Sequence, residues 1–160
     1  MENVIERLFL QPWYESLENP LQAQESVLKS LMEGYKRTGY GKDYGASGVS
    51  NIKDFRERFP AVTYRGLKPY IEEVNKGNFE ALLPEPPAAW VMTRGSTGPP
   101  KIIPATKTHL EQVFTCGARA FLNYALRKRD SKILAGGVLN LNFPSVVGTL
   151  IIAGKGVAYG

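Results

Sequence analysis

Apolar residues recur at helical spacing through most of the first 80 residues. Asn19-Pro20 is typical of a helix start, because a side chain that can cap the helix precedes a proline at the first helical position. One helix face then follows, made of Leu21, Leu28, Leu31, Met32 and Tyr35. Gly39 and Gly41 interrupt this spacing, so the pattern predicts a helix that ends before them.

Two shorter helices are predicted before residue 80. The first is expected to begin at a cap on Ser50, to bury Ile52, Phe55 and Phe59, and to stop at Pro60. The second is expected to begin at a cap on Thr63, to bury Leu67, Tyr70, Ile71 and Val74, and to end before Gly77. We therefore expect residues 1–80 to be mainly helical.

A proline-rich connection over residues 80–88 separates this region from one with a different pattern. The pattern beyond it predicts strands near 89–93, 101–106 and 132–139, with a long helix near 107–128. The apolar stripe of that helix is expected to pack on the sheet through Leu110, Val113, Phe114 and Phe121. The sequence thus predicts an α/β fold, with a helical part over 1–80 and an α/β segment over 81–160.

Composition limits the class of protein and the kinds of site. The chain has 160 residues, 43% of them apolar, which is enough to bury a sizeable core. A single cysteine, Cys116, excludes an internal disulfide and a cysteine zinc site, and a single histidine, His109, excludes a two-histidine metal motif. We therefore expect no dedicated metal-ligating residues and a reducing, cytoplasmic compartment. No apolar run reaches the roughly 18 residues of a transmembrane helix, so we expect no membrane association.

Positive charge is concentrated in one part of the chain. The net charge is +5, and residues 93–132, with eight Lys or Arg and two Asp or Glu, account for all of the excess, since residues 1–92 are net negative. Such a surplus fits either a solvated surface or a site for a phosphate-bearing ligand. Arg127-Lys128-Arg129 has a structural explanation, because positive charge is favourable in the last turn of a helix. We therefore do not expect a nucleic-acid partner, although a small phosphate- or nucleic-acid-binding module is kept as an alternative.

The segment Thr93–Lys101, Thr-Arg-Gly-Ser-Thr-Gly-Pro-Pro-Lys, combines glycines, hydroxyl groups and a lysine between two predicted strands. Glycines let backbone N–H groups turn toward an anion, and hydroxyl and ammonium groups add further donors, so the segment is suited to binding a triphosphate. It is not a Walker A loop, because Pro100 and Ile102 stand where that motif needs Gly and Ser or Thr. The spacing of a dinucleotide-binding fingerprint is also absent. Gly, Ser and Pro are also ordinary turn residues, so composition alone leaves a purely structural turn as an alternative.

This segment resembles the phosphate loop of the adenylate-forming enzyme superfamily. Upstream, the segments Thr38–Gly45, Ile52–Pro60 and Val62–Ile71 resemble the auxin-responsive (Gretchen Hagen) acyl-amido synthetase family. The matching segments span roughly residues 34–110 and occur in the family's order at compatible spacing. The resemblance implies part of the mixed sheet of the adenylate-forming N-terminal domain, preceded by a helical region.

The resemblance also implies roles for individual residues. Gly95, Ser96, Thr97 and Gly98 correspond to residues that contact the ATP phosphates, Thr93 to the first hydroxyl residue of the loop, and Lys101 to its lysine. Arg94 departs from the family pattern, and its side chain either obstructs the loop or reaches a phosphate. The implied chemistry uses ATP and Mg²⁺ to activate a carboxylic acid as an acyl-adenylate, which an amine or thiol then attacks.

Family members are several times longer than this chain, and nothing in residues 111–160 matches their downstream motifs. We therefore expect a truncated, incomplete N-terminal part of an adenylate-forming domain that is inactive alone. Apolar surface left uncovered is expected to favour a homo-oligomer or a complementary C-terminal part as partner. A non-enzymatic remnant that acts through protein–protein contacts is the other alternative.

Overall fold

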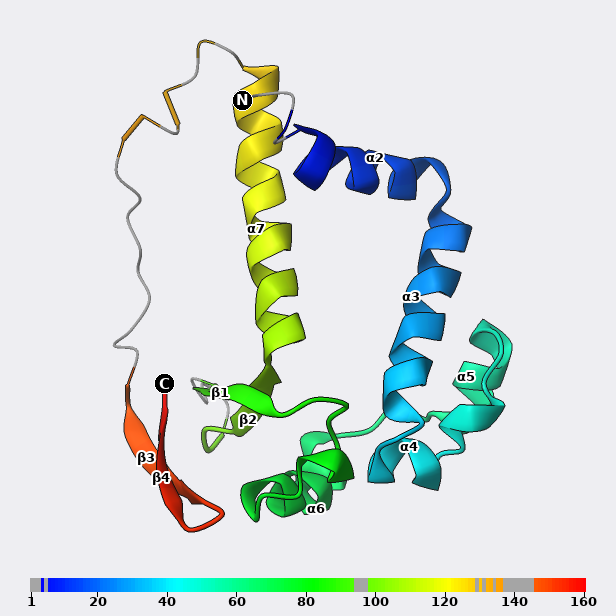
Figure 1. The fold of residues 1–160 in the computed structure, drawn as a ribbon, viewed down its shortest axis with the longest axis vertical. Helices are drawn as coiled ribbons and strands as arrows, with labels where there is room; N and C mark the ends of the chain where they lie inside the picture. The colour runs from blue at the N-terminus through cyan, green and yellow to red at the C-terminus, as the bar shows by residue number, and fades with distance from the viewer. Residues whose placement is uncertain are drawn as a thin grey trace. The chain divides into compact units, whose positions relative to one another are not determined.

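The computed structural model of the protein describes residues 4, 6–93, 98–128, 130, 132, 133, 135, 136 and 146–160. The chain divides into two compact units. The first consists of Met1–Ala23 and Thr108–Asn142, and the second of Gln24–Lys107 and Phe143–Gly160. Figure 1 shows the elements in chain order.

The N-terminal helices of the described chain are short, apart from one. They are the π-helix η1 (Glu6–Leu10), α2 (Gln11–Glu18), α3 (Pro20–Tyr35), α4 (Gly39–Asp43), α5 (Ile52–Arg58) and α6 (Tyr64–Asn75), with 3₁₀ turns η2 (Ala46–Gly48) and η3 (Phe79–Ala81). The helices predicted from apolar spacing near 20–35, 52–59 and 64–76 are therefore confirmed as α3, α5 and α6. The expected burial of the apolar face of α5 is wrong, because Ile52 is exposed and Phe55 and Phe59 are only half-buried.

A helix not predicted from the sequence, α4, follows α3 directly. Thr38 caps it: the hydroxyl accepts from the N–H of Gly41 at 3.0 Å and donates to the carbonyl oxygen of Tyr35 at 2.8 Å. A Cβ on Gly41 would lie 1.9 Å from that Tyr35 oxygen, so only glycine lets the two helices approach this closely. Gly41, one of the two glycines that signalled the end of α3, therefore also allows the next helix to approach it.

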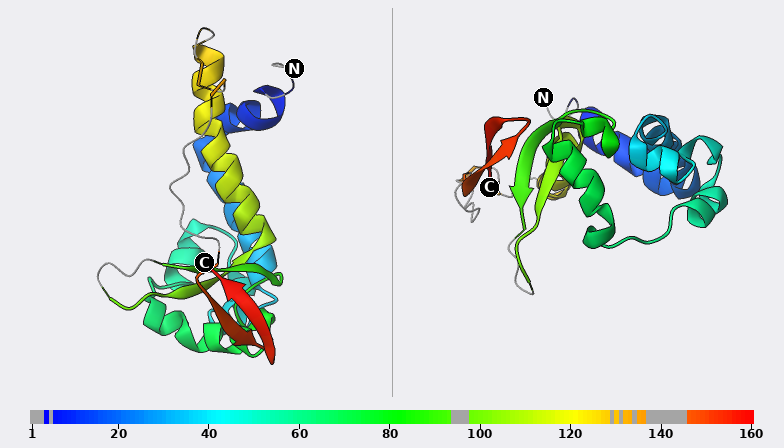
Figure 2. Two further views of the ribbon diagram at one scale, coloured as in Figure 1. Left: turned by 90° about the vertical axis from the view of Figure 1, so that its left-hand side faces the viewer. Right: turned by 90° about the horizontal axis from the view of Figure 1, so that it is seen from below.

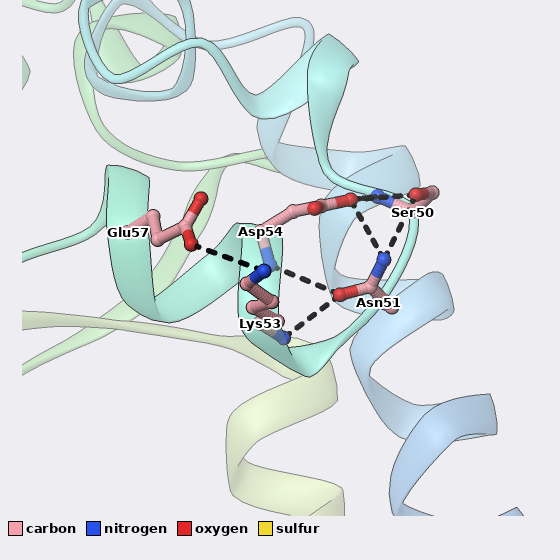
Figure 3. Close-up of polar contacts among 5 residues, drawn as sticks. All are labelled: Ser50, Asn51, Lys53, Asp54 and Glu57. Carbon is pink, nitrogen blue, oxygen red and sulfur yellow. Dashed lines mark hydrogen bonds and ion pairs between the residues drawn. The ribbon is translucent and has the colours of Figure 1, made fainter.

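The cap of α5 differs from the predicted one, as Figure 3 shows. Asn51, not Ser50, is the capping residue, and its side-chain oxygen accepts from the N–H groups of Lys53 and Asp54 at 2.8 and 3.0 Å. Ser50 instead donates to Asp54 through its hydroxyl and its backbone N–H. These two hydrogen bonds, the hydroxyl one first, hold the pKa of the Asp54 carboxyl below its usual value.

The end of α6 was predicted correctly. Gly77 has φ of +101°. The N–H of Asn78 donates to the carbonyl oxygen of Glu73, and the N–H of Gly77 donates to the carbonyl oxygen of Val74, both at 3.0 Å. This pair of bonds is the Schellman arrangement, which needs a left-handed residue just past the helix.

The sheet has four strands in the order β2-β1-β4-β3. Its strands are β1 (Pro87–Met92), β2 (Ile102–Thr106), β3 (Gly148–Ile152) and β4 (Lys155–Tyr159). The β1–β2 and β3–β4 pairs are antiparallel, whereas β1 and β4 are parallel at Trp90 and Tyr159. The predicted strands 89–93 and 101–106 are thus confirmed as β1 and β2, and the fold is a mixed α/β arrangement.

The predicted strand over 132–139 is wrong where the structure describes it. Residues 132, 133, 135 and 136 lie outside any strand, and the others in this range lie outside the described residues. The remaining strands come later, as the β3–β4 hairpin, with Ala153 and Gly154 at its turn. The hairpin was not predicted from the sequence, because small residues in both strands weaken the apolar pattern of a strand.

The core of the second unit lies between α6 and the sheet (Figure 2). Its buried side chains are Ile71 and Val74 of α6, Leu83, and Trp90 of β1. The hairpin adds partly buried side chains to it, namely Leu150, Ile152, Val157 and Tyr159. The backbone N–H of Ala153 at the hairpin turn also donates to the carbonyl of Asn75 at 3.1 Å. The last turn of α6 and the hairpin are therefore joined by both packing and a hydrogen bond.

The long helix α7 (Lys107–Arg127) forms as predicted, but the expected burial of its apolar stripe is wrong. No residue of α7 is buried: Val113, Phe114 and Phe121 are exposed, and Leu110 is half-buried. Within the first unit, Asn123 accepts from the hydroxyl of Tyr14 at 2.6 Å and Arg119 donates to the carbonyl of Phe9 at 3.1 Å. Those contacts come from two short elements, so most of the stripe has nothing to cover it in the described chain.

Candidate functional site

The glycine-rich segment predicted to bind phosphate connects β1 to β2, two antiparallel neighbours in the sheet. Beyond the last paired residues of these strands, the N–H of Thr93 donates to the carbonyl of Lys101 at 2.9 Å. The N–H of Lys101 in turn donates to the Thr93 hydroxyl oxygen at 2.9 Å. The two ends of the segment are therefore held together by the strand pair and by Thr93.

The predicted site residues fall into two groups. Thr93, Gly98 and Lys101 are described, whereas Gly95, Ser96 and Thr97, together with Arg94, lie outside the described residues. No atom lies within 4 Å of the position that a Cβ on Gly98 would take, so this part of the segment faces open space. The structure thus brings Thr93 and Lys101 together at one end of the sheet and leaves room beside Gly98.

Lys101 supplies the positive charge at this end of the sheet. Lys101 is exposed, and its ammonium group forms no salt bridge with any of the described residues. The Nζ atom lies 5.5 Å from the centre of the Tyr64 ring, within the range of a cation–π contact. Such a contact leaves the ammonium able to meet an anion, because the ring does not neutralise its charge.

Tyr64 is a residue at this site that the sequence analysis did not single out. It is the first residue of α6, and its hydroxyl donates to the carbonyl oxygen of Ile102 at 3.3 Å. The only signal in the sequence is its place in Val62–Ile71, one of the segments that carry the family resemblance. Its role depends on a contact between positions far apart in the chain, which a pattern of apolar residues does not show.

An apolar pocket of about 290 Å³ lies beside Tyr64 in the second unit. Its walls come from α3, α4, α6 and β2 and from the residues before α6 and after η3. Its lining residues are Tyr35, Tyr40, Val62, Tyr64, Leu67, Ile71, Leu82, Leu83, Ile103 and Pro104. Burial raises the pKa of the Tyr35 and Tyr40 phenols, so both are neutral at physiological pH. The pocket therefore offers apolar and aromatic surface and no charge from its own walls.

Metal ligands are not grouped in the part of the chain that the structure describes. There, no three His, Cys, Asp or Glu side chains come close enough together to hold a metal ion. No helix among the described residues is long and apolar enough to cross a membrane.

Comparisons with known proteins agree with the sequence resemblance. The chain is 31% identical over 100 residues to indole-3-acetic acid-amido synthetase GH3.2 of Arabidopsis thaliana, covering 61% of this chain and 18% of the relative. It is 26% identical over 124 residues to jasmonoyl-L-amino acid synthetase JAR4 of Nicotiana attenuata, covering 76% of this chain and 21% of the relative.

Solved structures of an acyl acid amido synthetase share the fold of this chain. A structure of the GH3.15 acyl acid amido synthetase in complex with 2,4-DB superposes with a TM-score of 0.67 at 26% identity. The superposition covers 90% of this chain and 26% of that one. This chain therefore spans about a quarter of the length of the solved relative and about a fifth of the curated relatives.

A family model also matches most of the chain. The model of the GH3 family N-terminal domain matches residues 10–147, which include the candidate phosphate-binding segment and the α6 residues beside it. Sequence, fold and relatives agree, and this chain belongs to the GH3 family.

Proposed function

We propose that this chain provides the ATP-phosphate-binding part of an acyl acid amido synthetase. The observation that carries the proposal is the segment Thr93–Lys101, closed at its ends by Thr93 and carrying an exposed lysine, in a member of the GH3 family. The relatives are named as an indole-3-acetic acid-amido synthetase and a jasmonoyl-L-amino acid synthetase, and one solved relative is in complex with 2,4-DB. We accordingly propose a carboxylic acid as the substrate that is activated and an amine as the acceptor.

In this proposal the reaction has two steps. A carboxylate oxygen attacks the α-phosphorus of ATP, pyrophosphate leaves, and an acyl-adenylate forms. The amine then attacks the acyl carbon, AMP leaves with the bonding electron pair, and the amine loses a proton. Neither step needs a nucleophilic side chain, so the chain's contribution is to orient the phosphates and neutralise their charge.

Lys101 and Thr93 have the groups for this task. The ammonium of Lys101 supplies positive charge at the C-terminal end of the segment, called its exit below. The Thr93 hydroxyl, which accepts from the Lys101 N–H, retains a proton to donate. Gly95, Ser96, Thr97 and Gly98 are proposed to contribute backbone N–H and hydroxyl donors. Mg²⁺ is proposed to arrive with the phosphates, since magnesium in such sites is held by one or two carboxylates together with substrate oxygens.

A titration of the 160-residue chain with MgATP, followed by NMR, tests the proposal. We expect resonances of residues 93–101 to move with a dissociation constant of roughly 1 mM, or about −4 kcal/mol. Lys101→Ala should remove most of the affinity, whereas Ser96→Ala should cost about 1 kcal/mol, the value of one neutral hydrogen bond. Lys53→Ala is the matched control, because Lys53 is an exposed lysine on α5 whose ion pair with Glu57 is long, 3.9 Å.

The Arg94→Ser variant distinguishes the two roles left open for Arg94. Binding should weaken if its guanidinium is a phosphate ligand and strengthen if its bulk obstructs the segment. The proposal fails if no resonance of residues 93–101 moves at any MgATP concentration, or if Lys101→Ala binds as well as the unchanged chain.

Catalysis by this chain alone is not part of the proposal. It spans about a fifth of the curated relatives, so we propose that further polypeptide is needed for turnover. Exchange of labelled pyrophosphate into ATP, measured with a panel of carboxylic acids, should stay at background. Robust exchange would show that the chain is sufficient by itself. The single cysteine favours a cytoplasmic location, which we also propose.

A second candidate function rests on α7. Its exposed stripe includes Phe114, 76% exposed, and Phe121, and exposed apolar surface of this kind marks protein–protein contacts. We therefore propose as the alternative that the chain acts through protein–protein contacts along α7, with itself or with a complementary part of a GH3 enzyme. Light scattering of the chain tests the contact with itself, because a monomer at high concentration excludes self-association.

A further inference from the structure

Tyr64 contacts both residues at the exit of the segment Thr93–Lys101. Its hydroxyl donates to the carbonyl oxygen of Ile102, the first residue of β2, at 3.3 Å. The ammonium nitrogen of Lys101 lies 5.5 Å from the centre of its ring. The Tyr64 side chain therefore contacts both the backbone of β2 and the ammonium group of Lys101.

Tyr64 is itself well fixed. It is the first residue of α6, it is half-buried, and it packs against the core cluster of Ile71, Val74, Leu83 and Trp90. Its ring also forms part of the wall of the apolar pocket. A ring held in this way restricts the positions of a neighbouring lysine, whose four-carbon side chain otherwise rotates freely.

Thr93 and Tyr64 thus hold different parts of Lys101. Thr93 binds the backbone of Lys101 and fixes where the segment begins and ends. Tyr64 contacts the Lys101 side chain, which Thr93 does not. Without the ring, the exposed ammonium would sample many more positions before a phosphate reached it, and binding would have to order it at an entropic cost.

We propose that Tyr64 is a positioning residue for phosphate binding: it holds the Lys101 ammonium at the exit of the segment and thereby raises affinity for a triphosphate. This inference rests on the proposed function only in requiring that Lys101 binds phosphate. The contact between Tyr64 and Lys101 can be measured with no ligand present, so the two claims can fail separately.

The first measurement is the ¹H–¹³C spectrum of the ligand-free chain. The ε-methylene resonance of Lys101 should be shifted upfield by the ring current of Tyr64. The shift should be lost in Tyr64→Leu and kept in Tyr64→Phe, which retains the ring. Tyr70→Phe is the control, because Tyr70 lies on the same helix and its hydroxyl donates to Asp43. An unchanged Lys101 resonance in Tyr64→Leu would overturn the proposal.

The second measurement is the MgATP titration of the same variants. An exposed cation–π contact corresponds to a change in affinity of about two- to fivefold, so Tyr64→Leu should weaken binding by that factor. Tyr64→Phe should bind nearly as well as the unchanged chain. In a Lys101→Ala background, Tyr64→Leu should cause no further loss, because its effect acts through the lysine.

A persistent effect of Tyr64→Leu in the Lys101→Ala background would overturn the proposal, since Tyr64 would then act through the fold. Equal affinity of Tyr64→Leu and the unchanged chain would overturn it as well. Tyr64→Met provides a second ringless variant with a longer, adaptable side chain in case leucine does not support folding. If the unchanged chain binds no MgATP, the proposed function fails and positioning for phosphate fails with it, and the ligand-free spectra still show whether Tyr64 holds Lys101.

Discussion

Gly77 is a position where one added methyl group should lower stability by a large and separable amount. It follows α6 with φ of +101°, and a Cβ placed there would lie 2.9 Å from the Cβ of Ala153 at the turn of the β3–β4 hairpin. Gly77→Ala therefore adds two penalties, a backbone conformation that alanine disfavours and a steric overlap with the hairpin. The first penalty is about 1–2 kcal/mol and the second about 1–3 kcal/mol.

Part of this loss is offset in the unfolded chain, which alanine restricts by about 0.4–1 kcal/mol relative to glycine. We expect Gly77→Ala to lower the free energy of unfolding by about 3 kcal/mol, a large share of the 5–15 kcal/mol typical of a domain. Gly154→Ala is the matched control, because Gly154 also has positive φ, +77°, but a Cβ there meets no atom within 4 Å. It should cost only about 1 kcal/mol, the backbone penalty less the unfolded-state gain.

The steric part can be isolated with Ala153→Gly. In that background the overlap is gone, so Gly77→Ala should cost about as much as Gly154→Ala, a coupling of about 2 kcal/mol between the two sites. Urea unfolding followed by the fluorescence of Trp90, a core residue of this unit, measures each variant. A Trp13→Phe background removes the other tryptophan. Equal costs at Gly77 and Gly154, or no rescue by Ala153→Gly, would refute the reasoning.

Three further predictions concern other parts of the fold. Thr38→Ala should lower stability by about 1–2 kcal/mol in a urea titration, because Thr38 is 1% exposed and caps α4, whereas Thr38→Ser should retain most of the cap. Tyr70 donates to Asp43, and this hydrogen bond raises the pKa of the Tyr70 phenol to about 12. Its contribution to stability should therefore be complete below its unfolded pKa near 10 and be lost as the pH rises through about 12. The pH dependence of phenolate absorbance should lose its highest step in Tyr70→Phe, and an unchanged profile would contradict the assignment. Phe114→Lys should change stability by less than about 0.5 kcal/mol but reduce self-association in sedimentation experiments, whereas Val74→Ala, at a side chain 1% exposed, should cost about 2 kcal/mol. Equal sedimentation of Phe114→Lys and the unchanged chain would show that this part of α7 is not a surface for self-association.

Much of the helical region and the first strand pair could be predicted from the sequence, because there the local signals agree with the packing. Ile71 and Val74 share a face of α6 and are buried in the core, and Gly77 ends that helix as its position suggested. The candidate site could be located for the same reason, since β1 and β2 are apolar strands joined by a segment rich in glycine and proline.

The β3–β4 hairpin was missed because its signal is weak and short. Ala153 and Gly154 form a two-residue turn in which both residues have positive φ, at +47° and +77°. Alanine is an unusual choice for the first of these positions, so the turn lacks the Asn-Gly or Asp-Gly sequence that usually marks such hairpins. Only the Gly at the second position gave a hint of it.

The exposed face of α7 could not be predicted for a different reason. Apolar spacing shows that a helix has a face to cover, but it does not show what covers it. Phe114 and Phe121 fit the pattern of a buried stripe and are nevertheless exposed. Tyr64 could not be found from the sequence for yet another reason. Its contacts are with Lys101 and Ile102, which lie far along the chain and meet it only after folding.

The single parallel pairing between β1 and β4 has a consequence for the order of events during synthesis on the ribosome. Trp90 and Tyr159 are paired across a long stretch of sequence, and the backbone of Gly160 completes the link through bonds with Trp90 and Met92. Helix α6 and the β1–β2 pair depend on contacts nearer in sequence, so they can form while the chain is still emerging. The hairpin can join them only once residue 160 has left the exit tunnel. Until then Trp90 lacks its neighbour on that side, and the nascent chain presents an open strand edge to which chaperones or other chains can bind.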